Sequence, residues 1–454
     1  MLAPNNQCLE GSPEPQTSCD TKHARQNSHK NRPVLLQITP HMKTELDNLM
    51  QQRSLDALLV SGGTHENPCM YYLANGAKVG AGTLAIKHRG HEPVLIVVGM
   101  ERDEAAKSGL QVVDRAKYKP SELLAAEGGD ALRAHARLVQ ALCADFGLSG
   151  SVGIYGRAEQ GHTLALFADL AQRMPAVRFV GETTPTVFDR AQRTKSAAEM
   201  ARIRRAAAAA ISVIGQTRDF LASHRARAGV LITAAGSPLT IGAVKREIRR
   251  WTFELELEDP EGVIFAIGRD AAVPHSHGED AQPIELGRTI VFDYFPREAG
   301  GGYFYDFTRT WCVGHAPPEV ERVHAEVHAA FDIAINSMFV GQACREPQRL
   351  VNEYFEKQGH PTSHSHPGTT NGYLHGLGHS LGLSVHEAIR LADVPGNDDK
   401  LEAGMVLTVE PGLYYPERGF GVRIEDFIYM NPDTGRPETI GEFDKQLVIP
   451  VRAG

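Results

Sequence analysis

Five potential metal ligands in the C-terminal half of the chain constrain its fold more than any other feature. Each stands in a short segment of its own that is either apolar and strand-like or rich in glycine; the five are Asp293, Asp306, His379, Glu410 and Glu425. Four carboxylates buried together would repel one another, and an unpaired buried charge is strongly destabilising. Two divalent cations would offset this repulsion. We therefore expect a fold that brings these distant segments to one centre around a pair of cations, for which manganese, cobalt and zinc suit the oxygen-rich ligands.

The motifs around these residues indicate how the ligands are presented. Thr289–Tyr294 and Tyr303–Thr310 are apolar runs separated by Gly300–Gly302, which predicts a hairpin with one aspartate in each run. In a strand, Arg423 and Glu425 would point to the same face, so Arg423 is positioned to orient Glu425. The remaining motifs are His375-Gly-Leu-Gly-His379, Glu410-Pro-Gly and Arg423-Ile-Glu425.

Taken together and in this order, the motifs resemble those of the Xaa-Pro peptidases in the pita-bread metallopeptidase family, which includes prolidase and aminopeptidase P. The resemblance also includes an aspartate before Thr308-Arg-Thr310 and a Val-His386-Glu segment after the His-Gly-x-Gly-His motif. It is strong over residues 196–450 and weak over residues 41–185. It implies an α+β fold, in which a pita-bread catalytic domain at residues 186–454 follows a smaller α/β N-terminal domain at residues 41–185.

The resemblance implies dinuclear-metal hydrolysis of the Xaa-Pro bond by a hydroxide that bridges the metals, as in an Xaa-Pro dipeptidase or an Xaa-Pro aminopeptidase. Asp306 and Glu425 would bridge two ions, manganese first and cobalt or zinc as alternatives. Asp293 would bind one ion, and His379 and Glu410 the other, with Glu410 as the candidate general base. The implied partners are a proline-containing peptide substrate and a second copy of the chain in a homodimer.

Three further histidines match family positions and complete the candidate catalytic and substrate-binding set. His386 is the main candidate for holding the substrate carbonyl and the oxyanion. His275 and His375 are expected to line the proline pocket, although His277 competes with His275 for its role. Tyr414 and Arg423 complete the predicted substrate contacts.

Other interpretations remain open. A lone histidine or carboxylate is most often a surface group or a satisfied core polar group, and His360, His364 and His366 lie in a Pro- and Ser-rich segment that predicts a solvated loop. The same fold also serves methionine aminopeptidases, creatinase-like amidinohydrolases and non-catalytic protein-binding modules. Creatinase-like proteins and binding modules shed ligand carboxylates, so the five intact positions favour a metallopeptidase.

Composition narrows the choice of partners. The 454 residues carry a net charge of −8, which disfavours nucleic acid and an anionic membrane as main partners. We find no apolar run of membrane-spanning length and no secretory signal. The six cysteines lack Cys-x-x-Cys spacing, which is typical of free thiols in a reducing cytoplasm. Residues 1–40 are polar and poor in large apolar side chains, so we expect a disordered tail there.

Alternating apolar runs and helical patterns predict the α/β order of the N-terminal domain. Strands are expected at residues 56–60, 71–73, 83–86, 93–98, 151–155 and 177–180. Helices are expected at residues 42–53, 131–146 and 164–173. In the catalytic domain, the capping box of Ser196 and Glu199 predicts a helix that begins there and ends near residue 219, and further helices are expected at residues 318–338 and 347–357.

Overall fold

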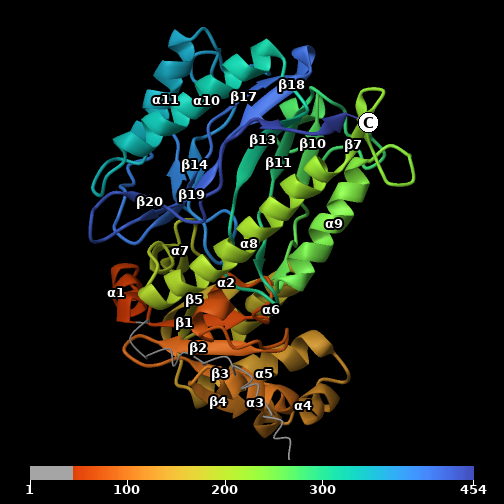
Figure 1. The fold of residues 1–454 in the computed structure, drawn as a ribbon. Coiled ribbons are helices and arrows are strands. Elements are labelled where there is room, and N and C mark those ends of the chain that lie inside the picture. Colours follow the sequence, from red (N-terminus) through yellow and green to blue (C-terminus); the bar gives the residue numbers. More distant parts are fainter. Residues whose placement is uncertain (1–43, 454) are drawn as a thin grey trace, which may run out of the picture. The chain divides into compact units, whose positions relative to one another are not determined.

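In the computed structural model, which describes residues 44–453, the first half of the chain forms a six-stranded sheet in the order β4-β3-β2-β1-β5-β6 (Figure 1). Only β2 runs antiparallel to its neighbours; the other adjacent pairs are parallel. The strands are β1 (Ala57–Ser61), β2 (Leu84–His88), β3 (Val94–Val97), β4 (Gln111–Asp114), β5 (Gly150–Gly156) and β6 (Val177–Val180). The predicted tail at residues 1–40 lies outside the described residues.

Side-chain alternation buries this sheet on both faces. In β1, Leu58 and Val60 belong to one apolar cluster, and Leu59 belongs to another that contains side chains of α5 and α6. In β3, Leu95 and Ile96 divide between the same two clusters, as a strand buried on both faces requires. The helices here are α1 (Thr44–Gln52), α2 (Pro68–Leu73), α3 (Arg102–Ala106), α4 (Pro120–Ala126), α5 (Ala131–Asp145), α6 (Gln160–Arg173) and α7 (Val187–Ala191).

One predicted strand is wrong. Tyr71–Leu73 forms the end of the short helix α2 instead. The Asn67 side chain accepts a hydrogen bond from the Met70 N–H, and Pro68 occupies the first turn. These two residues form a helix start that outweighs the strand preference of the tyrosines.

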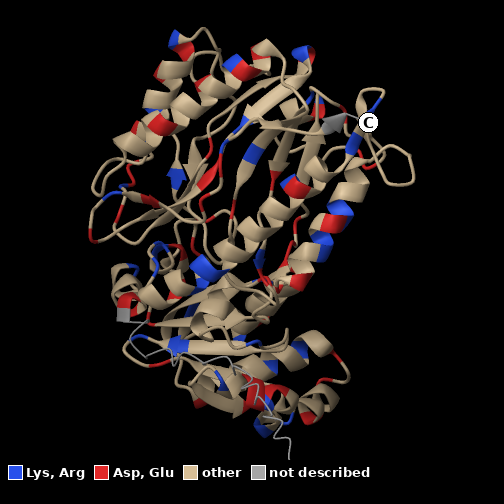
Figure 2. Cartoon of the chain, viewed as in Figure 1, with Lys and Arg blue, Asp and Glu red and all other residues tan. Residues whose placement is uncertain are grey.

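The second half of the chain packs helices against short curved sheets (Figure 1). Helices α8 (Ala197–Ser223) and α9 (Ile241–Glu254) share an apolar core with β10 and β11, whereas α10 (Pro318–Ser337) and α11 (Arg345–Lys357) share a second core with β16 to β18. The predicted capping box is present, with Ser196 and Glu199 bonded reciprocally to each other's backbone N–H. Figure 2 shows acidic and basic residues interspersed along these helices.

The predicted hairpin is present as the antiparallel pair β11 (Thr289–Asp293) and β13 (Thr308–Val313), in which Asp293 lies opposite Thr308. β10 (Ile264–Ile267) and β21 (Val448–Ile449) complete that sheet, in the order β10-β11-β13-β21. The remaining short strands are β7 (Arg225–Arg227), β8 (Val230–Ile232), β9 (Leu257–Glu258), β12 (Arg297–Glu298), β14 (Gly378–His379), β15 (Arg390–Leu391), β16 (Val406–Val409), β17 (Gly412–Tyr415), β18 (Phe420–Arg423), β19 (Asp426–Met430), β20 (Pro437–Thr439) and β22 (Arg452–Ala453).

The predicted solvated loop is wrong for its first histidine. His360 is buried, its Nε2 lies 2.9 Å from Glu326 Oε2, and its Nδ1 bonds the Tyr415 hydroxyl. His364 and His366 are exposed, as expected. Cys143, Cys312 and Cys344 are buried free thiols. Among residues 44–453, no helix combines the length and the apolar character needed to cross a membrane.

Candidate metal centre

Three of the five predicted ligands meet closely. Ligand atoms of Asp306, His379 and Glu425 lie within 4.8 Å of one another, and all three residues are buried. Asp306 stands two residues before β13, His379 ends β14, and Glu425 occupies the step between β18 and β19. Three segments that are 73 and 46 residues apart along the chain thus place one side chain each at a common point.

The His379 ring is arranged as a metal ligand. Its Nδ1 lies 3.3 Å from the Ser380 carbonyl, so Nδ1 carries the proton and Nε2 keeps its lone pair. Nε2 lies 3.7 Å from Asp306 Oδ2 and 3.7 Å from Glu410 Oε1. Burial and the neighbouring His386 lower the pKa of His379 to about 3. A neutral ring therefore presents a lone pair to two carboxylate oxygens, and a cation between these three acceptors would make the contact favourable.

Asp293 provides an independent sign of a cation. Its Oδ2 accepts a 2.6 Å hydrogen bond from Arg423 Nη2. Its Oδ1 is buried and has no hydrogen-bond partner among residues 44–453. Buried carboxylate oxygens are rarely left without a partner, so this oxygen fits a metal ligand.

The carboxylates also disturb one another's ionisation. Burial, together with the charges of Glu425, Asp293 and Glu410, raises the pKa of Asp306 well above its usual range. Burial and nearby Asp293 raise the pKa of Glu425 to about 8. Burial and Glu425 likewise raise the pKa of Glu410. Divalent cations would favour the ionised forms, and oxygen donors with one imidazole nitrogen fit two such ions.

Arg423 acts differently from the sequence-based prediction. β18 ends at Arg423, and Glu425 lies beyond it, so no single strand carries both residues. Arg423 binds Asp293 directly. It reaches Glu425 only through Thr308, whose hydroxyl accepts from Arg423 Nε at 3.1 Å and donates to Glu425 Oε2 at 2.7 Å.

A hydrogen bond joins the side chains of His375 and Tyr414. His375 Nδ1 donates to the Gly376 carbonyl at 2.8 Å, so its Nε2 accepts from the Tyr414 hydroxyl, also at 2.8 Å. The Tyr414 oxygen in turn accepts from Arg423 Nη1 at 3.1 Å. Both ring nitrogens of His375 are therefore engaged, and this ring lines the site without a spare N–H group.

The other two predicted histidines are more open. His386 is exposed, and its ring centroid lies 4.2 Å from that of His379. His275 is exposed as well. Burial lowers the pKa values of His375 and His386, and His275 lies close enough to both rings to add to this effect. By contrast, His277 Nδ1 bonds the Val263 carbonyl at 3.3 Å.

A cleft of about 370 Å³ leads to His386. Residues of both halves of the chain line it, including Glu66, Glu261, Arg297, Phe304 and His386. An extended peptide has room here, with acidic and basic side chains on its walls.

Two buried residues that support the ligands have no role in the sequence-based prediction. Thr308 joins Glu425 to Arg423, as described above. Arg309 donates to the Glu425 carbonyl at 2.7 Å and to Asp426 Oδ1 at 2.6 Å. The Thr308-Arg-Thr310 motif contained the signal, because an arginine in an apolar strand must find buried partners.

Comparisons with known proteins agree with this geometry. Residues 201–432, just over half of the chain, match the model of metallopeptidase family M24. An uncharacterized peptidase of Bacillus subtilis is 33% identical over 187 residues, which are 41% of this chain and 48% of that protein. An Xaa-Pro dipeptidase of Pyrococcus furiosus is 29% identical over 204 residues, 44% of this chain and 54% of that protein. The chain thus spans about half the length of these two curated relatives.

Solved structures extend the likeness to the whole fold. An Xaa-Pro dipeptidase of Bacillus anthracis superposes with a TM-score of 0.69 at 22% identity, covering 90% of this chain and 98% of that one. An X-Pro aminopeptidase of Thermotoga maritima gives a TM-score of 0.67 at 21% identity, covering 88% and 99%. The expected pita-bread fold behind an α/β N-terminal part is confirmed. From its motifs, its fold and its family match, this chain belongs to metallopeptidase family M24.

Proposed function

We propose that the protein hydrolyses the bond between a residue and the proline that follows it, with two divalent cations at the candidate metal centre. The observation that carries the proposal is the neutral His379 Nε2 directed at Asp306 and Glu410, since this contact calls for a cation. One sequence relative and two structural neighbours are Xaa-Pro peptidases, which supports the Xaa-Pro specificity. The donor set suits manganese first, with cobalt or zinc as alternatives.

The proposed ligands follow the sequence-based prediction. Asp306 and Glu425 would hold both cations, Asp293 would hold one of them, and His379 and Glu410 would hold the other. When bound, the cations supply Lewis acidity, which brings the pKa of water toward neutrality and polarises a carbonyl. The amide nitrogen of a bond to proline carries no hydrogen. Binding the substrate through its carbonyl therefore requires no hydrogen-bond acceptor for an N–H group.

Glu410 is our candidate for the base that takes the proton of the attacking water. Its side chain is 18% exposed, compared with 12% for Asp293 and 6% for Asp306, so it is the most accessible of these three carboxylates. His386, which lines the cleft, is our candidate donor to the oxyanion of the tetrahedral intermediate.

The other predicted residues hold the substrate. In this proposal the rings of His275 and His375 form walls of the proline pocket. Tyr414 and Arg423 keep His375 in one orientation through their hydrogen bonds. A homodimer and a cytoplasmic location complete the proposal.

The test compares hydrolysis of Gly-Pro with hydrolysis of a Gly-Pro-Yaa tripeptide in manganese, with chelator-treated protein as the control. Cleavage of the dipeptide alone indicates a dipeptidase, and release of glycine from the tripeptide indicates an aminopeptidase. Full activity of the chelator-treated protein contradicts the proposal.

A substitution isolates the proposed base. Glu410→Gln should lower turnover by about 10² or more, because a ligand and a base are lost together. The exposed Glu442→Gln is the matched control and should retain wild-type turnover. Near-normal turnover of Glu410→Gln excludes the role of Glu410.

A further inference from the structure

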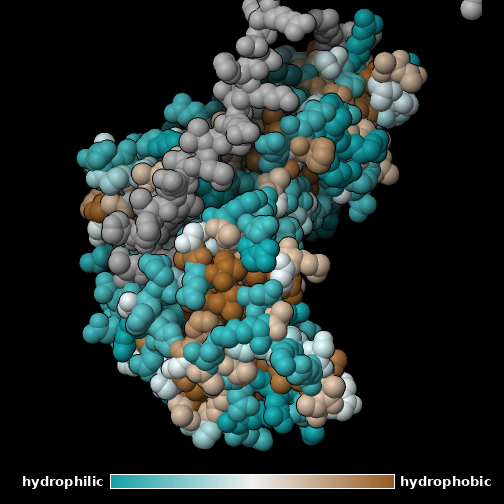
Figure 3. Space-filling view, turned by 90° about the horizontal axis from the view of Figure 1, so that it is seen from below, coloured by the Kyte–Doolittle hydropathy of each residue, from teal (hydrophilic) through white to brown (hydrophobic). Residues whose placement is uncertain are grey.

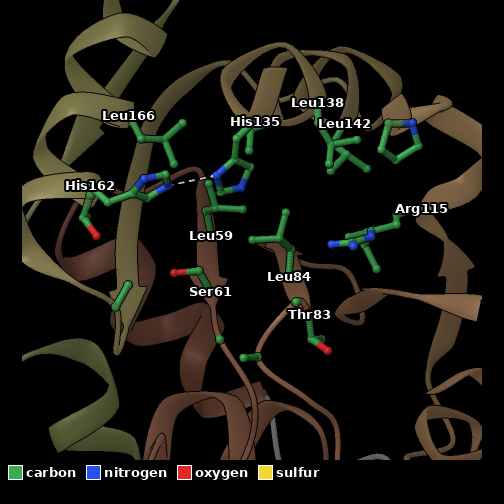
Figure 4. Close-up of a pocket in the computed structure, with 18 of the residues that line it drawn as sticks. Leu59, Ser61, Thr83, Leu84, Arg115, His135, Leu138, Leu142, His162 and Leu166 are labelled. Carbon is green, nitrogen blue, oxygen red and sulfur yellow. Dashed lines mark hydrogen bonds between the residues drawn. The ribbon is translucent and has the colours of Figure 1, made fainter. Parts of the chain in front are cut away.

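A second cavity lies in the six-stranded part of the chain and contains none of the five candidate metal ligands. Its volume is about 400 Å³, within the range of sites for small organic molecules. Leucines from the sheet and from helices α5 and α6 lie on its wall (Figure 4). They are Leu59, Leu84, Leu138, Leu142 and Leu166. The apolar wall favours a ligand with an apolar body.

The cavity opens where α/β sheets commonly bind ligands. Ser61 ends β1 and Gly62 follows it, Arg115 follows β4, and Arg157 follows β5. These strands are parallel, so their carboxyl ends meet at one edge of the sheet. Ligands of open α/β sheets occupy such an edge.

Two arginines give this edge a positive charge. Among residues 44–453, no carboxylate lies within ion-pair distance of Arg115 or Arg157. Figure 4 shows the Arg115 side chain extending into the cavity, across from His135. A Cβ atom at Gly82 would lie 3.1 Å from Arg115 Nη1, so the glycine leaves room for the guanidinium group.

Two acidic side chains that bond residues of the cavity lining, Glu101 and Glu159, are already engaged. Glu101 Oε2 accepts from the Thr83 hydroxyl at 3.3 Å, and Glu159 accepts from the Gly161 and His162 N–H groups at the start of α6. They leave the guanidinium groups available to an anion from solution.

A pair of histidines forms the opposite wall. His135 Nδ1 lies 3.2 Å from His162 Nε2, and Figure 4 shows this contact (dashed line). Burial, His162 and Arg115 lower the pKa of His135. His135 therefore adds hydrogen-bonding capacity to this wall without a further positive charge at neutral pH.

We propose that this cavity binds a small carboxylic acid with an apolar body, such as a medium-chain or aromatic carboxylate. Arg115, with Arg157 at the rim, binds the carboxylate, whose two oxygens match the donors of a guanidinium group. The leucines bury the apolar part. Figure 3, which views this end of the molecule from below, shows apolar side chains gathered between hydrophilic ones.

Calorimetric titration of decanoate into the metal-loaded full chain tests the proposal. Decanoate should bind with saturation at one molecule per chain, whereas decanol should bind at least tenfold more weakly and acetate should not bind measurably. Decanol binding as tightly as decanoate overturns the proposed role of the charge. A failure to bind decanoate overturns the site itself.

Substitutions locate the binding. Arg115→Gln should weaken decanoate binding at least tenfold, and Arg133→Gln should leave it unchanged, because Arg133 is an exposed arginine of α5 outside the cavity lining. Arg157 also lines the cleft at the metal centre, so a substitution of Arg157 would affect both sites and would not locate the binding. In a second measurement, decanoate should slow amide hydrogen exchange in α5 and α6. Unchanged exchange there, or equal binding by Arg115→Gln, overturns the proposal, and neither result depends on peptidase activity.

Discussion

Removal of the Thr308 hydroxyl tests whether residues that hydrogen-bond to the metal ligands control metal affinity. Thr308→Val keeps the side-chain volume and removes two hydrogen bonds, one to the Glu425 carboxylate at 2.7 Å and one from the Arg423 guanidinium at 3.1 Å. A hydrogen bond to a charged group contributes about 1.5–3 kcal/mol, and every 1.4 kcal/mol changes an equilibrium about tenfold. We therefore expect manganese to bind about 10- to 100-fold more weakly to Thr308→Val.

Thr310 provides a matched control on the same face of β13. Its hydroxyl donates to the Arg423 carbonyl at 3.0 Å and accepts from the Arg423 N–H at 2.8 Å, so both partners are neutral backbone groups. Thr310→Val should lower the free energy of unfolding by about 1–3 kcal/mol with little change in metal affinity. Calorimetric manganese titrations of chelator-treated protein, with urea unfolding alongside, measure both quantities. Wild-type affinity in Thr308→Val, or a larger loss of affinity in Thr310→Val, would refute this reasoning.

Three other predictions follow from the structure. Gly378→Ala would place a Cβ atom 2.1 Å from the Thr408 carbonyl oxygen, so the variant should unfold at lower temperature and lose manganese binding, as melting curves and dialysis would show. Arg309→Met removes one of the two cationic partners of buried Asp426 and leaves the other, Lys445, so it should lower the free energy of unfolding in urea by about 1.5–3 kcal/mol; a loss below about 1 kcal/mol would contradict a stabilising Arg309–Asp426 pair. Burial lowers the pKa of His324 from 6.5 to about 4, so unfolding takes up a proton and stability falls by up to about 3 kcal/mol as pH decreases from 6.5 to 4. His324→Leu should flatten that part of the curve of unfolding free energy against pH, and an unchanged curve would exclude His324 as its source.

Much of the site could be predicted because each ligand lies in a short segment with a recognisable sequence motif of its own. Asp293 ends an apolar run that forms β11, and His379 lies among glycines that bring β14 close to β16. The order of such motifs was informative because unrelated chains rarely keep all of them in one sequence.

Contacts between segments were harder to predict. Nothing in a single strand pattern shows that Thr308 would join Glu425 to Arg423, because the three residues meet only when β13 packs beside β18. His360 was assigned to solvent from its Pro- and Ser-rich neighbours, whereas its burial depends on Glu326 of α10 and on Tyr415 of β17. Likewise, Tyr71–Leu73 was assigned by strand preference, although the decisive signal was the helix start at Asn67 and Pro68.

The number of metal ions bound per chain tests the central claim most directly. Chelator-treated protein, dialysed against manganese and measured by atomic absorption, should take up two ions per chain, and Asp306→Asn should take up fewer. A wild-type chain that binds no manganese, cobalt or zinc at these positions would contradict the assignment of Asp293, Asp306, His379, Glu410 and Glu425 as ligands of a two-metal centre.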